Sequence, residues 1–382
     1  MDKDIKILIL YAKYGEGHLQ VSRVLQKQFA ANGIKNVRLE DLFADAHPVI
    51  DRMARFIYEQ SFSVASFLYG WSYYLTKNME NDNALSRHFN AFGIRKLQEL
   101  IKTDQPDIVI NTFPMLVMPE LKARTGADIP VFSILTDFDL HGRWLHSKID
   151  KYYVATEDLK AKIMNKGIPS QKVLASGIPI QQDFEHPRDA AAVQSKYGLD
   201  PSKKTILLMA ASYGGPREVG SACQFLANDE RLQMIVVCGK NKRLQQKMTD
   251  RFKHEPTLRI LGFTEDIPRL MEISSCIVTK PGGITLSEAL RCQLPIFLCR
   301  PVPGQEKENA RCLTEKGAAH IVDNKKNLAA DLRKFLFDDQ KLEEMKQAAH
   351  SLQKPKAAEN IVQDMLKETD RMKQRTERAH LF

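Results

Sequence analysis

The stretch that most constrains the fold of this chain runs from Cys276 to Ala310. A short apolar run over residues 276–279 ends in the turn Lys280-Pro281-Gly282-Gly283. A helical pattern follows, and then a second apolar run over residues 295–299. This order of strand, glycine turn, helix and strand is typical of an anion site at the carboxyl edge of a parallel sheet.

The residues of the turn and the helix start fit a diphosphate. Gly282 and Gly283 carry no Cβ, so the backbone can approach a ligand closely. The amides of Gly283, Ile284 and Thr285 are expected at the helix start, where the helix dipole favours negative charge, and the Thr285 hydroxyl adds a donor. Glu288 is placed to accept hydrogen bonds from two ribose hydroxyls.

Further polar residues surround the same turn. Lys280 adds a positive charge, and the loop after the second strand carries Gln305, Glu306 and Asn309, whose side chains can read hydroxyl groups on a sugar. An isolated Pro-Gly-Gly is more often only a turn. Here it occurs with the spaced Glu and with Gln-Glu-x-x-Asn in one strand–helix–strand unit. The combination predicts a site for a nucleoside diphosphate that carries a hydroxylated group.

These residues resemble a known family. The block resembles the nucleotide-sugar half of the lipid glycosyltransferases that have the two-domain GT-B fold. This group includes the transferase that adds N-acetylglucosamine to lipid I and the plant monogalactosyldiacylglycerol synthases. Over nearly the whole chain, the sequence most resembles the bacterial processive diacylglycerol β-glucosyltransferases. The resemblance implies that the C-terminal domain binds a UDP-sugar, that the N-terminal domain receives the acceptor, and that the active site lies in the cleft between them.

The length of 382 residues and the alternation of strand and helix signals in both halves predict two α/β domains with parallel sheets. We expect a Rossmann-like acceptor and membrane-binding domain over residues 1–180, a linker over 181–203 and a Rossmann-like UDP-sugar-binding domain over 204–356. By the resemblance, a final helix over 357–382 crosses back to the first domain.

The amino-acid composition limits which binding partners and which cellular compartment are expected. The formal charge of +9 fits attraction to anionic lipid or to nucleic acid, but no nucleic-acid-binding signature is present, so no nucleic-acid partner is expected. The six cysteines form no C-x-x-C pair, which predicts reduced thiols. No apolar run is long enough to span a membrane, and the N-terminus lacks signal-peptide features. We expect a peripheral protein on the cytoplasmic face of the cell membrane.

The first strand of the chain leads into a second candidate site. The apolar run over residues 5–11 ends in a turn with Gly17, and His18 stands at the start of the next helical pattern. Asp137 follows another buried run, over residues 131–135, and the carboxyl ends of parallel strands share one edge. Either His18 oriented by Asp137, or Asp137 itself, is the predicted general base. The related galactosyltransferases have a Thr-Asp motif with a following His and Trp at this position.

Two loops of the second half join the donor site by the resemblance. Ser212, Tyr213 and Gly214 follow the strand predicted over residues 205–211 and are expected to face the diphosphate. Phe263 stands in the loop that holds the base in related enzymes.

An aromatic segment marks the acceptor side. Residues 60–76 contain no charged side chain but many aromatic ones, which favour the membrane–water interface. Ordinary core helices are the alternative, because aromatic stripes often pack inward. The predicted acceptor and membrane residues are Phe62, Phe67, Tyr69, Trp71, Tyr73, Phe113, His141 and Trp144.

The predicted reaction is transfer of glucose, with inversion, from UDP-glucose to 1,2-diacylglycerol, and by the resemblance to the glucosylated product, as in synthesis of membrane glycolipids and lipoteichoic acid anchors. No cofactor is expected, and no metal, since no Asp-x-Asp motif stands out. UDP-galactose as donor and lipid I as acceptor of N-acetylglucosamine are alternatives. Other classes are a UDP-N-acetylglucosamine 2-epimerase, which would need further acid–base carboxylates, and an inactive UDP-sugar sensor, against which intact His18 and Asp137 argue.

Overall fold

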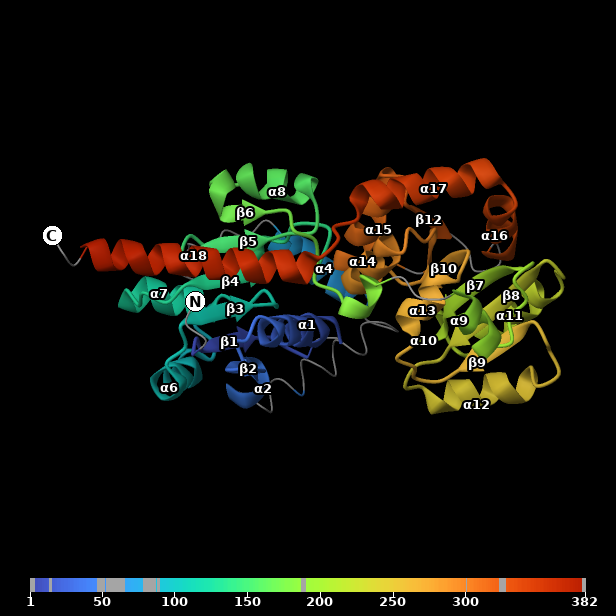
Figure 1. Ribbon diagram of the computed structural model, residues 1–382, viewed down its shortest axis with the longest axis horizontal. Helices are drawn as coiled ribbons and strands as arrows, with labels where there is room; N and C mark the ends of the chain where they lie inside the picture. The colour runs from blue at the N-terminus through green and yellow to red at the C-terminus, as the bar shows by residue number, and fades with distance from the viewer. Residues whose placement is uncertain are drawn as a thin grey trace. The chain divides into compact units, whose positions relative to one another are not determined.

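The computed structural model describes residues 4–13, 16–46, 52, 66–77, 87, 90–186, 190–299, 301–322 and 328–379. The chain divides into two compact units (Figure 1). Unit 1 comprises Met1–Ile180, Val302–Gln305 and Lys354–Phe382, and unit 2 comprises Gln181–Pro301 and Glu306–Gln353.

Unit 1 is built on a six-stranded parallel sheet in the order β2-β1-β3-β4-β5-β6. Its strands are β1 (Ile7–Leu10), β2 (Val37–Glu40), β3 (Ile108–Asn111), β4 (Val131–Ile134), β5 (Lys151–Tyr153) and β6 (Val173–Leu174). The central strands β1, β3 and β4 are buried throughout, as continuous runs of Ile, Leu and Val predict for parallel strands covered on both faces.

Unit 1 also contains helices. They are α1 (Gly17–Ala31), α2 (Leu42–Ala46), α4 (Ser66–Lys77), α6 (Ile94–Asp104), α7 (Val117–Thr125), α8 (Glu157–Met164) and α18 (Ala357–Ala379), with short 3-10 helices η1 (Gly142–Trp144) and η2 (Ser170–Lys172). In α1 the buried residues Val21, Val24, Leu25 and Phe29 recur at helical spacing.

The long final helix α18 belongs to unit 1 (Figure 1). Its buried residues Ile361, Val362 and Met365 form one face. Its acidic side is tied to the sheet, because Asp364 accepts hydrogen bonds from Lys151 at 2.9 Å and from the Tyr153 hydroxyl at 2.9 Å.

Unit 2 contains a second six-stranded parallel sheet, in the order β12-β11-β10-β7-β8-β9. The strands are β7 (Lys204–Met209), β8 (Leu232–Val237), β9 (Leu258–Leu261), β10 (Cys276–Thr279), β11 (Ile296–Cys299) and β12 (Ala319–Val322). The helices are η3 (Gln182–Phe184), α9 (Ala190–Lys196), α10 (Ala210–Tyr213), α11 (Pro216–Ala227), α12 (Lys242–Arg251), α13 (Ile267–Glu272), α14 (Gly283–Arg291), α15 (Gln305–Glu315), α16 (Leu328–Leu336) and α17 (Asp339–Leu352).

The boundaries differ from the predicted ones in two places. The described residues of the expected linker, 181–186 and 190–203, belong to unit 2. Glu185 accepts a hydrogen bond from Arg291 at 2.8 Å, and the Tyr197 hydroxyl donates to Asp266 at 2.6 Å. The chain rejoins unit 1 at Lys354, and the short segment Val302–Gln305 also groups with unit 1. The polar composition of these residues suggested a linker, because composition does not predict which tertiary contacts a segment makes.

None of the helices described is both long and apolar enough to cross a bilayer.

Candidate functional site

The side chain of His18 lies at the start of α1, beside the carboxyl ends of β3 and β4. Its Nδ1 atom is 2.7 Å from the backbone carbonyl of Thr112, which follows β3, and 3.3 Å from the hydroxyl of Thr136, which follows β4. A carbonyl oxygen can only accept, so Nδ1 carries the proton in this bond. The other ring nitrogen, Nε2, is therefore left with its lone pair and is able to accept a proton.

Neighbouring hydroxyls hold this part of α1 against the sheet. The Ser22 hydroxyl donates to the His18 carbonyl at 2.8 Å and lies 2.9 Å from the Thr112 hydroxyl. The ring of Phe113 meets the imidazole edge-on, with the centroids 5.0 Å apart. The imidazole is thus fixed by the Thr112 carbonyl, the Thr136 hydroxyl and an aromatic ring before any ligand binds.

The surroundings keep His18 uncharged. Burial lowers the pKa of the imidazole to about 4, although the hydrogen bond to the Thr112 carbonyl acts in the opposite direction. The ring is therefore neutral at pH 7. A neutral imidazole with its tautomer set by a backbone carbonyl is the state that a general base requires.

The expectation that Asp137 orients His18 needs correction. Among the described residues, the partners that hold the imidazole are the Thr112 carbonyl and the Thr136 hydroxyl. Asp137 is half-buried directly after Thr136, and its direct role in proton transfer stays a prediction. Thr112 and Thr136 were the residues to notice, because they stand one and two residues after strands that end at this edge.

The start of α14 in unit 2 is where the anion site is predicted. The turn between β10 and α14 is closed by a hydrogen bond from the Gly282 amide to the Lys280 carbonyl at 2.9 Å. The first bond of the helix runs from the Leu286 amide to the Gly282 carbonyl, and no side chain of the described residues caps the helix. The amides of residues 283–285 are thus the donors that a helix leaves without intrahelical partners.

The turn is open toward a ligand. A Cβ placed on Gly282 would have no atom within 4 Å among the described residues, so there is free space beside this backbone. Thr285 is half-buried and Glu288 is 6% exposed, one turn further along α14. Their predicted roles, as hydroxyl donor and ribose acceptor, stay predictions.

Helix α15 buttresses the same turn. The Asn309 side chain is 1% exposed and its amide donates to the Pro281 carbonyl at 3.2 Å. The Lys280 ammonium lies 3.4 Å from the Glu306 carboxylate. Asn309 therefore holds the turn in place, in contrast to the prediction that it reads a sugar directly, while Gln305 is half-buried at the first position of α15.

Comparisons of the sequence with known proteins show the family of this chain. A family model described as monogalactosyldiacylglycerol synthase matches residues 18–180, and one described as the glycosyltransferase family 28 C-terminal domain matches residues 217–361. The processive diacylglycerol β-glucosyltransferase of Bacillus cereus is 40% identical over 369 residues, which cover 96% of this chain and 95% of that protein. The chain belongs to the processive diacylglycerol β-glucosyltransferases.

Solved structures agree on the fold of this glucosyltransferase. The UDP-GlcNAc 2-epimerase of Neisseria meningitidis, bound to UDP-GlcNAc, superposes with a TM-score of 0.61 at 16% identity, over 95% of this chain and 100% of that one. MurG of Acinetobacter baumannii superposes with a TM-score of 0.60 at 16% identity, over 95% and 99%. Likeness at such low identity shows the GT-B fold and no more.

The glucosyltransferase buries several residues predicted for its acceptor side. Trp144 is 3% exposed, so the prediction that it lies against a lipid is wrong. His141, 9% exposed, lies with Nε2 3.2 Å from both the Tyr73 carbonyl and the Thr76 hydroxyl, and its Nδ1 accepts from the Arg143 amide. Burial lowers the pKa of His141 to about 4. His141 and Tyr73 therefore anchor α4.

The end of α4 is held by a charged cluster that sequence reasoning missed. Asp139 is 5% exposed and pairs with Lys77, on α4, at 2.6 Å and with Lys162 at 2.5 Å. Burial acts to raise the pKa of Asp139, but the two lysines hold it below its usual value. Residues 137–139 read Asp-Phe-Asp, so the expectation that the chain has no obvious Asp-x-Asp motif was wrong. The second carboxylate of this motif, that of Asp139, forms ion pairs with two lysines.

The exposed side of α4 is apolar. Trp71 is 60% exposed, Tyr74 40% and Leu75 56%, and this i, i+3, i+4 spacing places them on one face. The predicted residue Phe62, and the side chains of Phe67 and Tyr69, lie outside the described part of the structure.

The loops predicted to face the diphosphate differ from each other. The chain after β7 continues into the short helix α10, and Tyr213 is 1% exposed in the core of unit 2, so its predicted contact with the donor is wrong. Gly214 follows in extended backbone, and the Ser212 side chain lies outside the described part. Phe263, after β9, is 67% exposed and available to a ligand.

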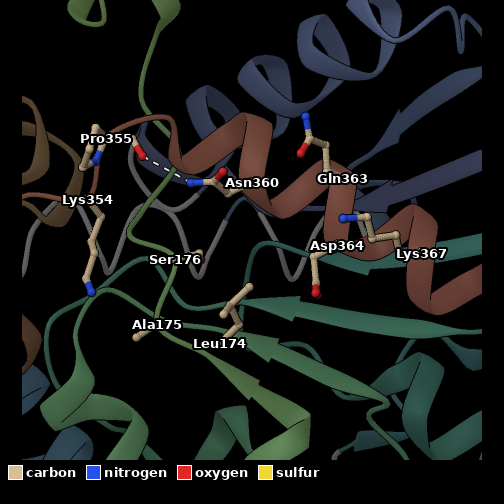
Figure 2. Close-up of a pocket in the computed structure, with 9 residues that line it drawn as sticks. All are labelled: Leu174, Ala175, Ser176, Lys354, Pro355, Asn360, Gln363, Asp364 and Lys367. Atoms are coloured by element: carbon tan, nitrogen blue, oxygen red, sulfur yellow. Dashed lines mark hydrogen bonds between the residues drawn. The ribbon is translucent and has the colours of Figure 1, made fainter.

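A separate hollow of about 500 Å³ lies in unit 1 where β6 ends beside the start of α18 (Figure 2). It is lined by Leu174, Ala175, Ser176, Lys354, Pro355, Asn360, Gln363, Asp364 and Lys367. Lys354 lies 3.4 Å from Glu157, and Asp364 is neutralised by Lys151. None of the predicted site residues lines this hollow, and its charges are largely balanced.

Proposed function

We propose that this chain transfers glucose from UDP-glucose to the free hydroxyl of 1,2-diacylglycerol, with inversion to a β-linked glucolipid. Family membership supports the donor and acceptor, since the relative is named for diacylglycerol and β-glucosyl transfer. The observation that carries the proposal is the neutral His18 ring, held by the Thr112 carbonyl so that Nε2 can accept a proton.

The acceptor hydroxyl is a weak nucleophile and needs a base. Nε2 of His18 takes the proton of this hydroxyl while its oxygen bonds to the anomeric carbon of glucose. The bond from that carbon to the diphosphate oxygen breaks, and the electron pair leaves with UDP. Attack from the side opposite the leaving group gives inversion. Asp137, as the base in place of His18, is the alternative.

The departing UDP carries the growing negative charge. The amides of Gly283 and Ile284, with the Thr285 hydroxyl, are fixed donors that can stabilise this charge without rearranging. The Lys280 ammonium adds a positive charge. Glu288 binds the ribose and Phe263 lies beside the base. The reaction proposed here needs no metal ion, and undiminished turnover in excess EDTA is the expected result.

The lipid is reached from the membrane surface. Trp71, Tyr74 and Leu75 form an exposed apolar face on a helix that is anchored from behind by His141. Aromatic side chains with polar tips are typical of membrane–water interfaces. We propose peripheral docking of α4 on the cytoplasmic leaflet, helped by anionic lipids and the net charge of +9.

Vesicle sedimentation tests the docking face. Replacement of Trp71, Tyr74 and Leu75 by Ser should lower the fraction of protein bound to anionic diacylglycerol vesicles about tenfold, because exposed apolar area is lost from the interface. The matched control is Phe225→Ser, which removes an aromatic ring that is 61% exposed on unit 2. Equal vesicle binding by both variants would show that α4 is not the docking helix.

Product analysis tests the activity. The full chain is incubated with labelled UDP-glucose, UDP-galactose or UDP-N-acetylglucosamine and diacylglycerol vesicles, and the lipids are separated. We expect label from UDP-glucose in monoglucosyl-diacylglycerol and then in longer products. Label only from UDP-galactose, or only with lipid I as acceptor and UDP-N-acetylglucosamine as donor, would replace the proposed substrates. Epimerised nucleotide without labelled lipid would indicate an epimerase.

A further inference from the structure

The Lys280 side chain at the diphosphate turn has an anionic neighbour in its own unit. Its ammonium lies 3.4 Å from the carboxylate of Glu306, at the second position of α15. The side chain of Glu306 is 9% exposed and that of Lys280 is 39% exposed. The acid is thus the buried partner and the ammonium the more exposed one.

A bound diphosphate changes this balance. The Lys280 ammonium that would approach the donor's phosphates is the one that pairs with Glu306. Its interaction with the diphosphate therefore weakens its ion pair with Glu306, and the reverse is also true. Drawing a cation away from a buried carboxylate costs free energy, which a new hydrogen-bond donor to that carboxylate can offset. In the UDP-sugar complex a sugar hydroxyl can donate to Glu306, but UDP alone brings no such group.

We propose that Glu306 is a positioning residue that competes with the diphosphate for Lys280, and thereby weakens the binding of UDP more than the binding of UDP-glucose. In the empty site the carboxylate pairs with the ammonium at the turn. After the sugar has been transferred, the ion pair between Lys280 and Glu306 forms again. Reclaiming the ammonium favours release of the product UDP. This inference rests on the proposed function, since it needs the donor diphosphate at the start of α14.

Helix α15 offers a matched control. Glu308 is two residues along, its side chain is 8% exposed against 9% for Glu306, and it pairs with Arg311 at 2.9 Å. Glu306→Gln and Glu308→Gln each remove one buried carboxylate charge from α15. Only the first removes a charge that competes for Lys280.

Calorimetric titration with UDP tests the proposal on the full chain. Glu306→Gln should bind UDP about fivefold more tightly than wild type, the scale of one partly exposed ion pair. UDP should also become a stronger product inhibitor, while Glu308→Gln should bind UDP like wild type. In a Lys280→Gln background, the further change Glu306→Gln should leave UDP affinity unaltered, because the contested cation is gone.

The outcomes separate this inference from the proposed function. If wild type fails to bind UDP, the donor site itself is misassigned. If wild type binds UDP but Glu306→Gln binds it equally or more weakly, the competition is refuted. Should Glu306→Gln fail to fold, Glu306→Asp, whose shorter side chain withdraws the carboxylate from the ammonium, should still tighten UDP binding; unchanged affinity there would equally refute it.

Discussion

Acidification of the assay should leave kcat/KM almost unchanged well below the pH at which an ordinary histidine becomes charged. The pKa of His18 is lowered to about 4 by burial, so the free enzyme keeps the base neutral in weak acid. The acid limb of a kcat/KM profile reports the essential base of the free enzyme. The position of that limb is therefore a direct measure of the environment of His18.

The size of the effect follows from the two pKa values. At about pH 5.5, a base with a pKa of about 4 is roughly 97% neutral, whereas an unperturbed histidine with a pKa of about 6.5 is roughly 9% neutral. The lowered pKa thus predicts a rate about tenfold higher at this pH than an ordinary imidazole would allow.

Initial rates with labelled UDP-glucose and diacylglycerol in phosphatidylcholine vesicles, at constant ionic strength, give the profile without a titrating lipid charge. His18→Gln should reduce kcat about 10²-fold, the scale of general-base effects. His254→Gln, which replaces an exposed histidine of unit 2, is the matched control and should behave as wild type. An inflection near pH 6.5 in wild type would refute the assignment of a buried, carbonyl-bound base.

Three further outcomes are expected. If Asp137 is the base in place of His18, Asp137→Asn should lower kcat about 10²-fold in the same assay, and near-normal rates would remove this carboxylate from the chemistry. Glu288→Ala should raise the Kd for UDP about tenfold, since two ribose hydrogen bonds are lost; unchanged calorimetric affinity would contradict the ribose role. The lowered pKa values of His18 and His141, both about 4, mean that the unfolded chain binds protons first as the pH falls. Unfolding free energy, measured by denaturant titration, should therefore decrease between about pH 6.5 and 4, by up to ~3 kcal/mol per imidazole.

The strands and the diphosphate turn were predictable because their signals are local. Runs such as Ile7–Leu10 and residues 108–110 are apolar without interruption, which is typical of parallel strands buried on both faces. Likewise, the order of an apolar run, Gly282-Gly283 and a helical pattern predicts the turn between β10 and α14, while the binding of an anion there stays a prediction.

The interpretation failed where a side chain had two possible environments. Trp144 and Tyr213 follow strand ends, as site residues do, but their rings fill the core. Nothing in the composition distinguishes an aromatic ring that packs inward from one that meets a ligand. The exposed Trp71 and the buried Tyr73 lie two positions apart on one helix, so only the direction of the helix face separates them.

Contacts between residues distant in sequence also could not be predicted. The group that orients His18 is a backbone carbonyl, which every residue possesses and no motif can mark. Lys280 and Glu306 were both assigned to the ligand, whereas in the structure they lie beside each other. Such pairing depends on how β10 and α15 are placed by the sheet, which the order of residues does not specify.

A base with a pKa of about 4 is poorly matched to deprotonating an alcohol at neutral pH, since catalysis is most efficient when the pKa lies near the working pH. The substrate supplies the missing driving force. In the proposed transfer complex the attacking hydroxyl and the diphosphate lie on opposite sides of the same anomeric carbon. The base that receives the proton is therefore roughly 7 Å from the leaving diphosphate oxygen, and the diphosphate charge acts on it. At an effective dielectric constant of ~20, one charge at this distance favours the imidazolium by about 2 kcal/mol, more than one pKa unit.

The bound donor should therefore raise the pKa of His18, and the acid limb of kcat, which reports the enzyme–substrate complex, should lie at least about one pH unit above that of kcat/KM. Both limbs come from one set of saturation curves recorded at each pH, so lipid effects common to the two cancel. Because the charge in question belongs to the diphosphate, a titration of His18 followed by NMR should show the same rise on addition of UDP. Coincident limbs, together with an imidazole that does not respond to UDP, would mean that the base does not sense the donor, and His18 would lose its place in the reaction.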